Sequence, residues 1–206
     1  MARLFDDASS EYLTINSTVL TATPITMACW FNSDSITAGQ MLICITDTAT
    51  GDHFFYMKAG GDVASDPVRI IARDTGNGVA DTSTGYSANT WHHACGVFAS
   101  TTSRSAYLDG GGKISNTTSI TPSAAALDAT TIGVLRTNAL AEYMSGRIAE
   151  VAIWNIALTD GEVAILALGY SPLFIHPQSL VAYWPLIRES VGDGTGDGLD
   201  IVGGNN

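Results

Sequence analysis

Basic side chains are scarce in this chain. Nine Lys and Arg residues stand against twenty Asp and Glu residues in a length of 206, which gives a formal net charge of -11 at pH 7. A charge of this sign repels phosphate backbones and anionic bilayers at ordinary ionic strength. We therefore expect neither nucleic acid nor a membrane surface among the partners of this protein.

Long apolar runs are missing as well. No segment approaches the roughly 18 consecutive apolar residues that a membrane-spanning helix needs. The amino terminus, MARLFDDASSEYL, has no basic region followed by an apolar stretch, as a secretory signal peptide would have. The sequence thus predicts no membrane insertion, and synthesis in the cytoplasm without ordinary secretion.

Cysteine is rare and present in an odd number, as Cys29, Cys44 and Cys95. Each of the three lies in an apolar, strand-like segment, which favours buried free thiols. A disulfide is the alternative, and it requires two of them to be adjacent in space. The sequence has no closely spaced set of Cys and His residues of the kind that zinc requires.

Helical patterns are also few, whereas glycine and short alternating segments are abundant. The 21 glycines and the 46% of hydrophobic residues indicate short strands, joined by tight turns, around one substantial core. Asp109-Gly110 predicts a hairpin, because a tight two-residue turn needs positive φ angles. We expect strands over 90–98, 103–108, 129–135 and 144–155.

One short helix is expected near 159–168. Thr159 followed three residues later by Glu162 fits a capping box, in which the two side chains accept hydrogen bonds from free amides of the first turn. Gly169 is suited to end the helix. The expected length is about three turns.

Several motifs occur together in a characteristic order. WHHACGVF, AYLDG, TIG and SGRIAEVAIWNIALTDGEV, preceded by LFDDASSEYLTI and PITMACWFN, resemble the laminin G-like, concanavalin A-like lectin/glucanase superfamily in its bacterial and phage variant. The resemblance covers roughly residues 1–170 and implies an all-β fold, a two-sheet antiparallel jelly-roll sandwich. It leaves the ligand open, because such folds host lectins, adhesion modules, hydrolases and structural proteins.

The carboxy-terminal segment differs in composition from the rest. We expect residues 1–206 to form a single domain in which 171–206 is a Pro- and Gly-rich extension. Pro172 and Pro177 each remove an amide donor, which predicts a traversing loop. The run LVAYWPL over 180–186 is then expected to add a closing strand beside the first one.

Acidic and glycine-rich loops are the candidate metal sites. Asp193, Asp197 and Asp200 lie in VGDGTGDGLD, where carboxylates and backbone carbonyls could bind calcium. The loop fails the EF-hand pattern, because Gly204 stands where the bidentate Glu should be. Two further loops carry oxygen ligands, namely Asp47 with Asp52 and Asp74 with Asn77. Asp and Gly more often serve solvated turns without a metal, and the ligands of calcium-binding relatives cannot be matched here residue by residue. We therefore assign no metal ligand and no cofactor, with calcium as the open candidate.

Catalytic residues are not recognisable in the sequence. His92 and His93 are adjacent in a strand, so their side chains point to opposite faces and cannot converge on one atom. Glu142 and Glu150 share a face by parity, but eight residues of continuous strand would separate them by roughly 26 Å, too far for glycoside hydrolysis. We therefore expect a protein that is not an enzyme.

Aromatic side chains near the loops could form a sugar platform. The tyrosines available for this role are Tyr56, Tyr86, Tyr143 and Tyr170. The tryptophans lie in strand patterns and are expected to fill the core or a sheet face; they are Trp30, Trp91, Trp154 and Trp184.

The function that we expect is non-catalytic recognition or adhesion, with a glycan or surface protein as ligand. An extracellular type of fold without a signal peptide suggests display on a virion, as a phage decoration, tail or fibre protein, or on another extracellular assembly. One alternative is a purely structural capsid decoration or oligomerisation protein, with capsid or tail proteins or copies of itself as partners. The other is a hydrolase acting on polysaccharides.

Overall fold

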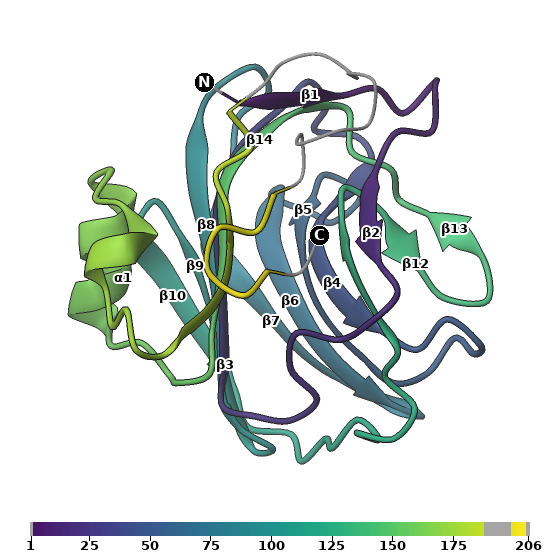
Figure 1. Cartoon of the computed structure of the whole chain (residues 1–206). Coiled ribbons are helices and arrows are strands. Elements are labelled where there is room, and N and C mark those ends of the chain that lie inside the picture. The colour runs from purple at the N-terminus through teal and green to yellow at the C-terminus, as the bar shows by residue number, and fades with distance from the viewer. Residues whose placement is uncertain (1, 188–198, 205–206) are drawn as a thin grey trace.

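The computed structural model describes residues 2–187 and 199–204. Two large antiparallel sheets pack face to face, as Figure 1 shows, which confirms the expected all-β jelly-roll sandwich. A seven-stranded sheet has the order β1 (Arg3–Phe5), β14 (Gly146–Trp154), β3 (Ile25–Ser33), β8 (His92–Ser100), β9 (Ser103–Leu108) and β10 (Gly111–Asn116), with β15 (Leu180–Trp184) also paired to β14. Within the described part of the chain, no helix is long and apolar enough to cross a membrane.

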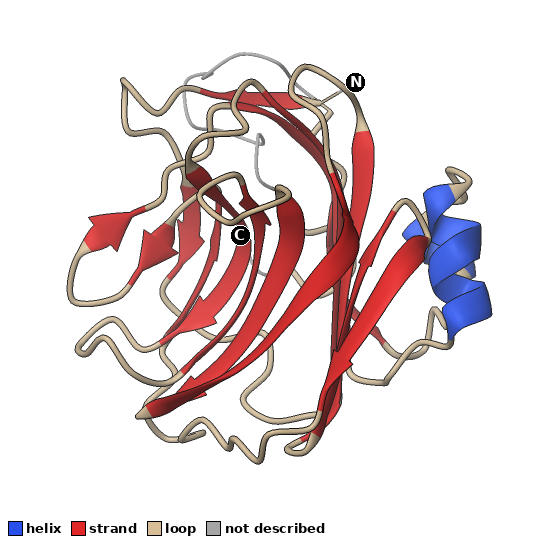
Figure 2. Ribbon diagram, turned by 180° about the vertical axis from the view of Figure 1, so that it is seen from behind, coloured by secondary structure: helices blue, strands red, loops and turns tan. Residues whose placement is uncertain are grey.

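A six-stranded sheet forms the second layer. Its order is β2 (Leu13–Ile15), β11 (Ala129–Ile132), β4 (Gly39–Thr46), β5 (Phe54–Gly60), β6 (Pro67–Asp74) and β7 (Gly76–Gly85). A small ribbon of β12 (Leu135–Arg136) and β13 (Leu140–Ala141) lies beside it. The helix α1 (Asp160–Ala167) and the 3-10 turn η1 (Pro172–Phe174) complete the fold, and α1 lies against the outside of the seven-stranded sheet (Figure 2).

Three hydrophobic clusters hold these layers together. The largest fills the space between the two sheets, the second joins the seven-stranded sheet to α1, and the third lies on the outer face of the six-stranded sheet. Each cluster contains one of the cysteines, in the order Cys29, Cys95 and Cys44. All three are free and buried, as expected, and burial raises the pKa of the Cys44 thiol to about 12.

The hairpin and the helix cap form as the sequence predicts. Asp109 and Gly110 connect β9 to β10 with φ angles of 52° and 73°, the positive values that the turn requires. Thr159 and Glu162 form the capping box of α1, and Gly169 follows the helix with a φ of 88°. The helix has eight residues, about two turns rather than the three expected.

The closing strand takes a different place from the one expected. β15 pairs with β14 over Val151–Trp154, whereas β1 pairs with β14 over Gly146–Ile148. The first and last strands therefore follow one another along the same edge of β14 instead of pairing with each other. Both strands fit along this one edge of β14 because each of them is short.

Candidate functional site

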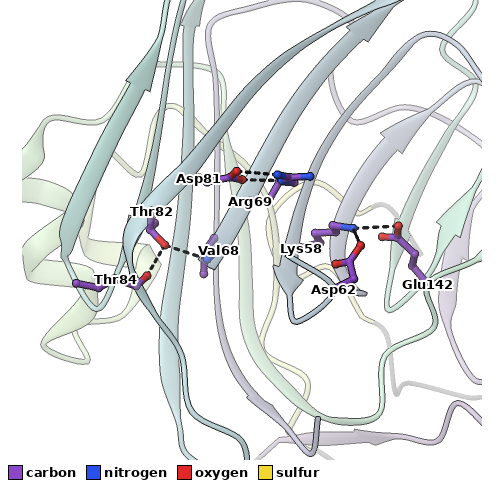
Figure 3. Close-up of polar contacts among 8 residues, drawn as sticks. All are labelled: Lys58, Asp62, Val68, Arg69, Asp81, Thr82, Thr84 and Glu142. Carbon is purple, nitrogen blue, oxygen red and sulfur yellow. Dashed lines mark hydrogen bonds and ion pairs between the residues drawn. The ribbon is translucent and has the colours of Figure 1, made fainter. Parts of the chain in front are cut away.

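A row of charged side chains crosses the outer surface of the six-stranded sheet (Figure 3). Lys58 of β5 is opposite Arg69 of β6, which is opposite Asp81 of β7. Successive residues of a strand face opposite sides, and the neighbours Ala59 and Ile70 pack in the core between the sheets. The charged row therefore faces away from that core, and we call this surface of β4 to β7 the six-stranded face.

Every cation of this row is held by carboxylates. Arg69 donates two hydrogen bonds to Asp81, from Nε at 2.6 Å and from Nη2 at 2.7 Å. Lys58 Nζ lies 3.0 Å from carboxylate oxygens of both Asp62 and Glu142, and the lysine side chain is only 3% exposed. Hydrogen bonding to Asp81 raises the pKa of Arg69. Two cations against three carboxylates leave the row without a net positive charge.

An apolar row lies directly beside the charged one. Tyr56, Ile71 and Val79 are opposite one another on β5, β6 and β7 and belong to the outer hydrophobic cluster. Phe54 stacks on Tyr56 with ring centroids 5.1 Å apart, and the guanidinium carbon of Arg73 lies 5.9 Å from the centroid of the Phe54 ring. Phe54, Tyr56 and Ile71 are buried, whereas Val79 is half-buried. A fixed ion pair next to a partly open apolar side chain suits a ligand that presents both hydroxyl groups and C–H surface.

A local irregularity of the ladder positions Arg69. The pairing of β6 with β7 shifts register between Pro67 and Arg69. At this point the Thr82 hydroxyl accepts from the backbone N–H of Val68 at 3.0 Å and donates to the carbonyl of Thr84 at 2.7 Å (Figure 3). The side chain of Thr82 thus replaces a missing ladder bond and keeps Arg69 opposite Asp81.

The candidate calcium loops are organised by the protein itself. Asp193 and Asp197 lie outside the described residues. Asp200 is buried, and its Oδ1 accepts from the backbone N–H groups of Tyr183, Val202 and Gly203 at 2.8 to 3.0 Å. This carboxylate ties the residues that follow it to β15.

The two other loops form turns with similar internal contacts. Asp47 accepts from the backbone of Ala49 and the hydroxyl of Thr50, and Asp52 pairs with Arg73. The two residues of the other loop also have partners within the protein. Oδ1 of Asp74 lies 3.2 Å from Nδ1 of His53, and Oδ1 of Asn77 accepts a hydrogen bond from Nη1 of Arg73. Among residues 2–187 and 199–204, no three His, Cys, Asp or Glu side chains gather in a metal-binding group.

The two histidines point to opposite sides of β8, as predicted. His92 Nδ1 lies 2.7 Å from the Asp109 carboxylate, and its ring contacts Phe31 at the rim of the inter-sheet core. His93 is 2% exposed on the other side, against the ring of Trp30.

The two glutamates do not share a face, so the parity argument was wrong. Glu142 precedes β14 and pairs with Lys58 on the six-stranded face, whereas Glu150 lies on the outer surface of the seven-stranded sheet beside Tyr183. The strand begins only at Gly146, and its register against β3 shifts between Ala149 and Ala152. Both features break the alternation on which the parity argument depended.

The aromatic residues are distributed differently from the expectation. Tyr56 and Tyr86 are 6% and 4% exposed, so they are not open platforms, while Tyr170 is 58% exposed. Trp154 and Trp184 are buried as expected, whereas Trp91 precedes β8 and is 41% exposed. Tyr143 and Trp30 are half-buried.

Lys58, Arg69 and Asp81 were missed by sequence reasoning. Each is one charge within an otherwise apolar or alternating strand, the kind of position where a charge is unexpected unless it is paired. Their meeting depends on the register of three strands, which no local motif records.

Comparison with known proteins agrees with this architecture. The family model described as "Concanavalin A-like lectin/glucanases superfamily" matches residues 7–164. No curated protein sequence matches the chain significantly.

Similar solved structures include several domains of this kind. The CBM40 of the Ruminococcus gnavus IT-sialidase bound to alpha2,3 sialyllactose is 14% identical, with a TM-score of 0.61 over 71% of this chain and 84% of that one. A heptameric SAP-like pentraxin from Limulus polyphemus is 17% identical, with a TM-score of 0.59 over 78% and 77%. The NanB sialidase of Streptococcus pneumoniae is 18% identical, with a TM-score of 0.64 over 79% of this chain but only 27% of that one. At these identities the likeness shows the fold alone.

Proposed function

Since the chain belongs to the concanavalin A-like lectin/glucanases superfamily, we propose that it is a non-catalytic recognition module that binds glycans through the six-stranded face. The observation that carries this proposal is the half-buried ion pair of Arg69 and Asp81, which lies beside the half-buried Val79 on this face. A sugar needs this combination, because its hydroxyl groups require hydrogen-bonding partners and its C–H surface packs on apolar groups.

The charge balance of the face favours neutral glycans. A carboxylated sugar would need a cation with unused hydrogen-bonding capacity, since charge-assisted bidentate pairs are the strong contacts to carboxylates. Here Arg69 already binds Asp81 with two hydrogen bonds, and Lys58 lies between two carboxylates. Neutral hydroxyl groups can donate to these carboxylates without displacing the ion pairs.

The positions of the acidic groups support a non-catalytic role. Glycoside hydrolysis places two carboxyl groups about 5 to 10 Å apart on one groove. Glu142 and Glu150, the pair considered from the sequence, lie on the outer surfaces of different sheets.

Removing one ion pair of the face should abolish most glycan binding. We expect Arg69→Met/Asp81→Leu to weaken binding to the best neutral hit of a glycan array by at least about tenfold, because hydrogen bonds to charged groups are lost. Changing both partners avoids leaving an unpaired charge. The measurement is isothermal titration calorimetry after an array screen, run with calcium and again with a chelator.

The matched control removes an ion pair away from this face. Lys113 Nζ lies 2.7 Å from Oδ1 of Asp160, the first residue of α1, so Lys113→Met/Asp160→Leu likewise removes one cation and one carboxylate without changing a residue of β5 to β7. This control should keep the affinity of the unmodified protein. A blank array, or equal affinities in the two double variants, would overturn the proposal.

A second candidate function is assembly on a particle such as a virion or another extracellular structure. The observation in its favour is a group of exposed apolar side chains on α1, η1 and the loop between them; its members are Ile165, Leu168, Tyr170, Leu173 and Phe174. Leu168 and Phe174 are each 77% exposed, and exposed apolar groups that cluster mark interaction surfaces.

Self-association through this cluster has a direct test. If copies of the chain associate there, light scattering should give an oligomer for the unmodified protein and a monomer for Leu168→Ser/Phe174→Ser. Exposed positions tolerate such changes, so the melting temperature of the monomer should change little. A monomeric unmodified protein that binds glycans would leave recognition as the function.

A further inference from the structure

A cavity of about 420 Å³ lies on the outer side of the seven-stranded sheet, across the sandwich from the six-stranded face. β3 and β8 contribute Trp30 and His93, β14 and β15 contribute Glu150 and Tyr183, and the segment after α1 contributes Tyr170. We call this cavity the β14 pocket. It is independent of the glycan proposal, because it shares no residue with the six-stranded face.

The first unusual feature of the β14 pocket is its histidine. His93 is 2% exposed, and its Nδ1 is buried without a hydrogen-bond partner among the described residues. Burial lowers the pKa of His93 to about 4, so the ring is neutral near pH 7. A neutral imidazole has one nitrogen that accepts a hydrogen bond. A buried polar atom left unpaired is costly, and the residue that carries it is part of the pocket lining.

The second feature is the backbone at Glu150. This residue lies in the bulge of β14 between Ala149 and Ala152, with a φ of 54°, a conformation that side chains with a Cβ rarely adopt. The bulge inserts one residue, so Glu150 lies at the pocket while Val151 still packs in the inter-sheet core. Unfavourable backbone conformations of this kind concentrate at functional sites.

The third feature is the charge of the pocket. The Tyr183 hydroxyl donates to Oε2 of Glu150, but no cationic side chain of residues 2–187 and 199–204 pairs with this carboxylate. Neither Lys nor Arg occurs in the described lining, whereas Trp30 and Tyr170 supply aromatic rings. The one charged side chain of the described lining is thus the carboxylate of Glu150, next to two π systems that attract cations.

We propose that the β14 pocket binds a primary ammonium group carried on a short carbon chain, with Glu150 as counter-ion, His93 as hydrogen-bond acceptor, and Trp30 and Tyr170 around the alkyl stem. Three N–H donors of an ammonium match the carboxylate, the imidazole nitrogen and one further acceptor. Both a free amine and a lysine side chain have this chemistry. The net charge of -11 favours the approach of either.

Calorimetric titration with two probes tests the site. The probes are n-butylammonium chloride and N-acetyl-lysine N-methylamide, and n-butanol is the neutral analogue of the first. We expect at least one of the two ammonium probes to bind, and n-butanol to bind roughly tenfold or more weakly because it lacks the charge. Binding of n-butylammonium alone identifies a free amine as the ligand type, and binding of the lysine derivative identifies a side chain.

The decisive variant is Glu150→Gln, which keeps an acceptor for Tyr183 but removes the charge. It should weaken ammonium binding roughly ten- to a hundredfold, whereas Glu11→Gln, the same change at a distant carboxylate, should have no effect. His93→Phe serves as a second variant that removes the acceptor and should also weaken binding. Absence of binding by both probes to the unmodified protein, or equal binding in Glu150→Gln and Glu11→Gln, would overturn the proposal.

Discussion

Trp154→Ala is expected to lower the free energy of unfolding by about 3 to 5 kcal/mol, the cost of replacing a fully buried large aromatic residue by alanine. Trp154 is 0% exposed and lies in the hydrophobic cluster between the seven-stranded sheet and α1, where it packs with Val163 and Leu166 of the helix. Its indole Nε1 also donates to the carbonyl of Ile175 at 2.7 Å. The substitution therefore leaves both a cavity and a buried carbonyl without its donor.

The loss is measured by urea denaturation followed by circular dichroism. Trp91→Ala is the matched control, because Trp91 is 41% exposed and the same atoms are removed. We expect the control to change the free energy of unfolding by no more than about 0.5 kcal/mol. Similar losses in the two variants would show that burial of the indole under α1 does not contribute as described. A large loss in Trp154→Ala alone would show that the hydrophobic cluster between the seven-stranded sheet and α1 contributes strongly to the free energy of unfolding.

Features encoded by adjacent residues were predictable from the sequence. The Asp109-Gly110 turn and the Thr159/Glu162 capping box each depend on residues within a few positions of one another, and both form as predicted. The sandwich itself followed from the order of several such local motifs. Burial of Cys29 and Cys95 followed in the same way, from the apolar character of their own strands.

Features that depend on strand register were not predictable in the same way. Glu150 escapes the alternation of β14 because of a bulge, and the bulge is visible only in its pairing with β3. The six-stranded face brings together Lys58, Arg69 and Asp81 from three strands whose spacing along the chain follows no motif. A shift of one residue in any of these strands would turn its charge toward the core. Candidate binding residues are therefore a property of the assembled sheet.

Gly78→Ala is expected to destabilise the protein by roughly 2 to 4 kcal/mol, although alanine in a strand is ordinarily more favourable than glycine. Alanine is expected to destabilise the protein at this position because a Cβ at Gly78 would overlap the guanidinium group of Arg104. Arg104 is 1% exposed at the edge where β7 approaches β9 and β10. Its Nη1 donates to Asn116 Oδ1 at 2.5 Å, and its Nη2 donates to the carbonyls of Thr101 and Thr118, each at 2.8 Å.

Since no carboxylate of the described residues pairs with Arg104, these neutral acceptors are what stabilise its buried charge. A methyl group at position 78 must push the guanidinium away from them, and both the charge and the acceptors then lose their partners. The cause can be isolated by a double-mutant cycle with Arg104→Met, measured by urea denaturation. In the Arg104→Met background, Gly78→Ala should cost less than about 1 kcal/mol, because the flexible methionine chain can yield to the new methyl group. An equal cost in both backgrounds would place the strain in the backbone of β7. A strongly non-additive cycle would show that Arg104 can be buried between β7, β9 and β10 because position 78 has no side chain.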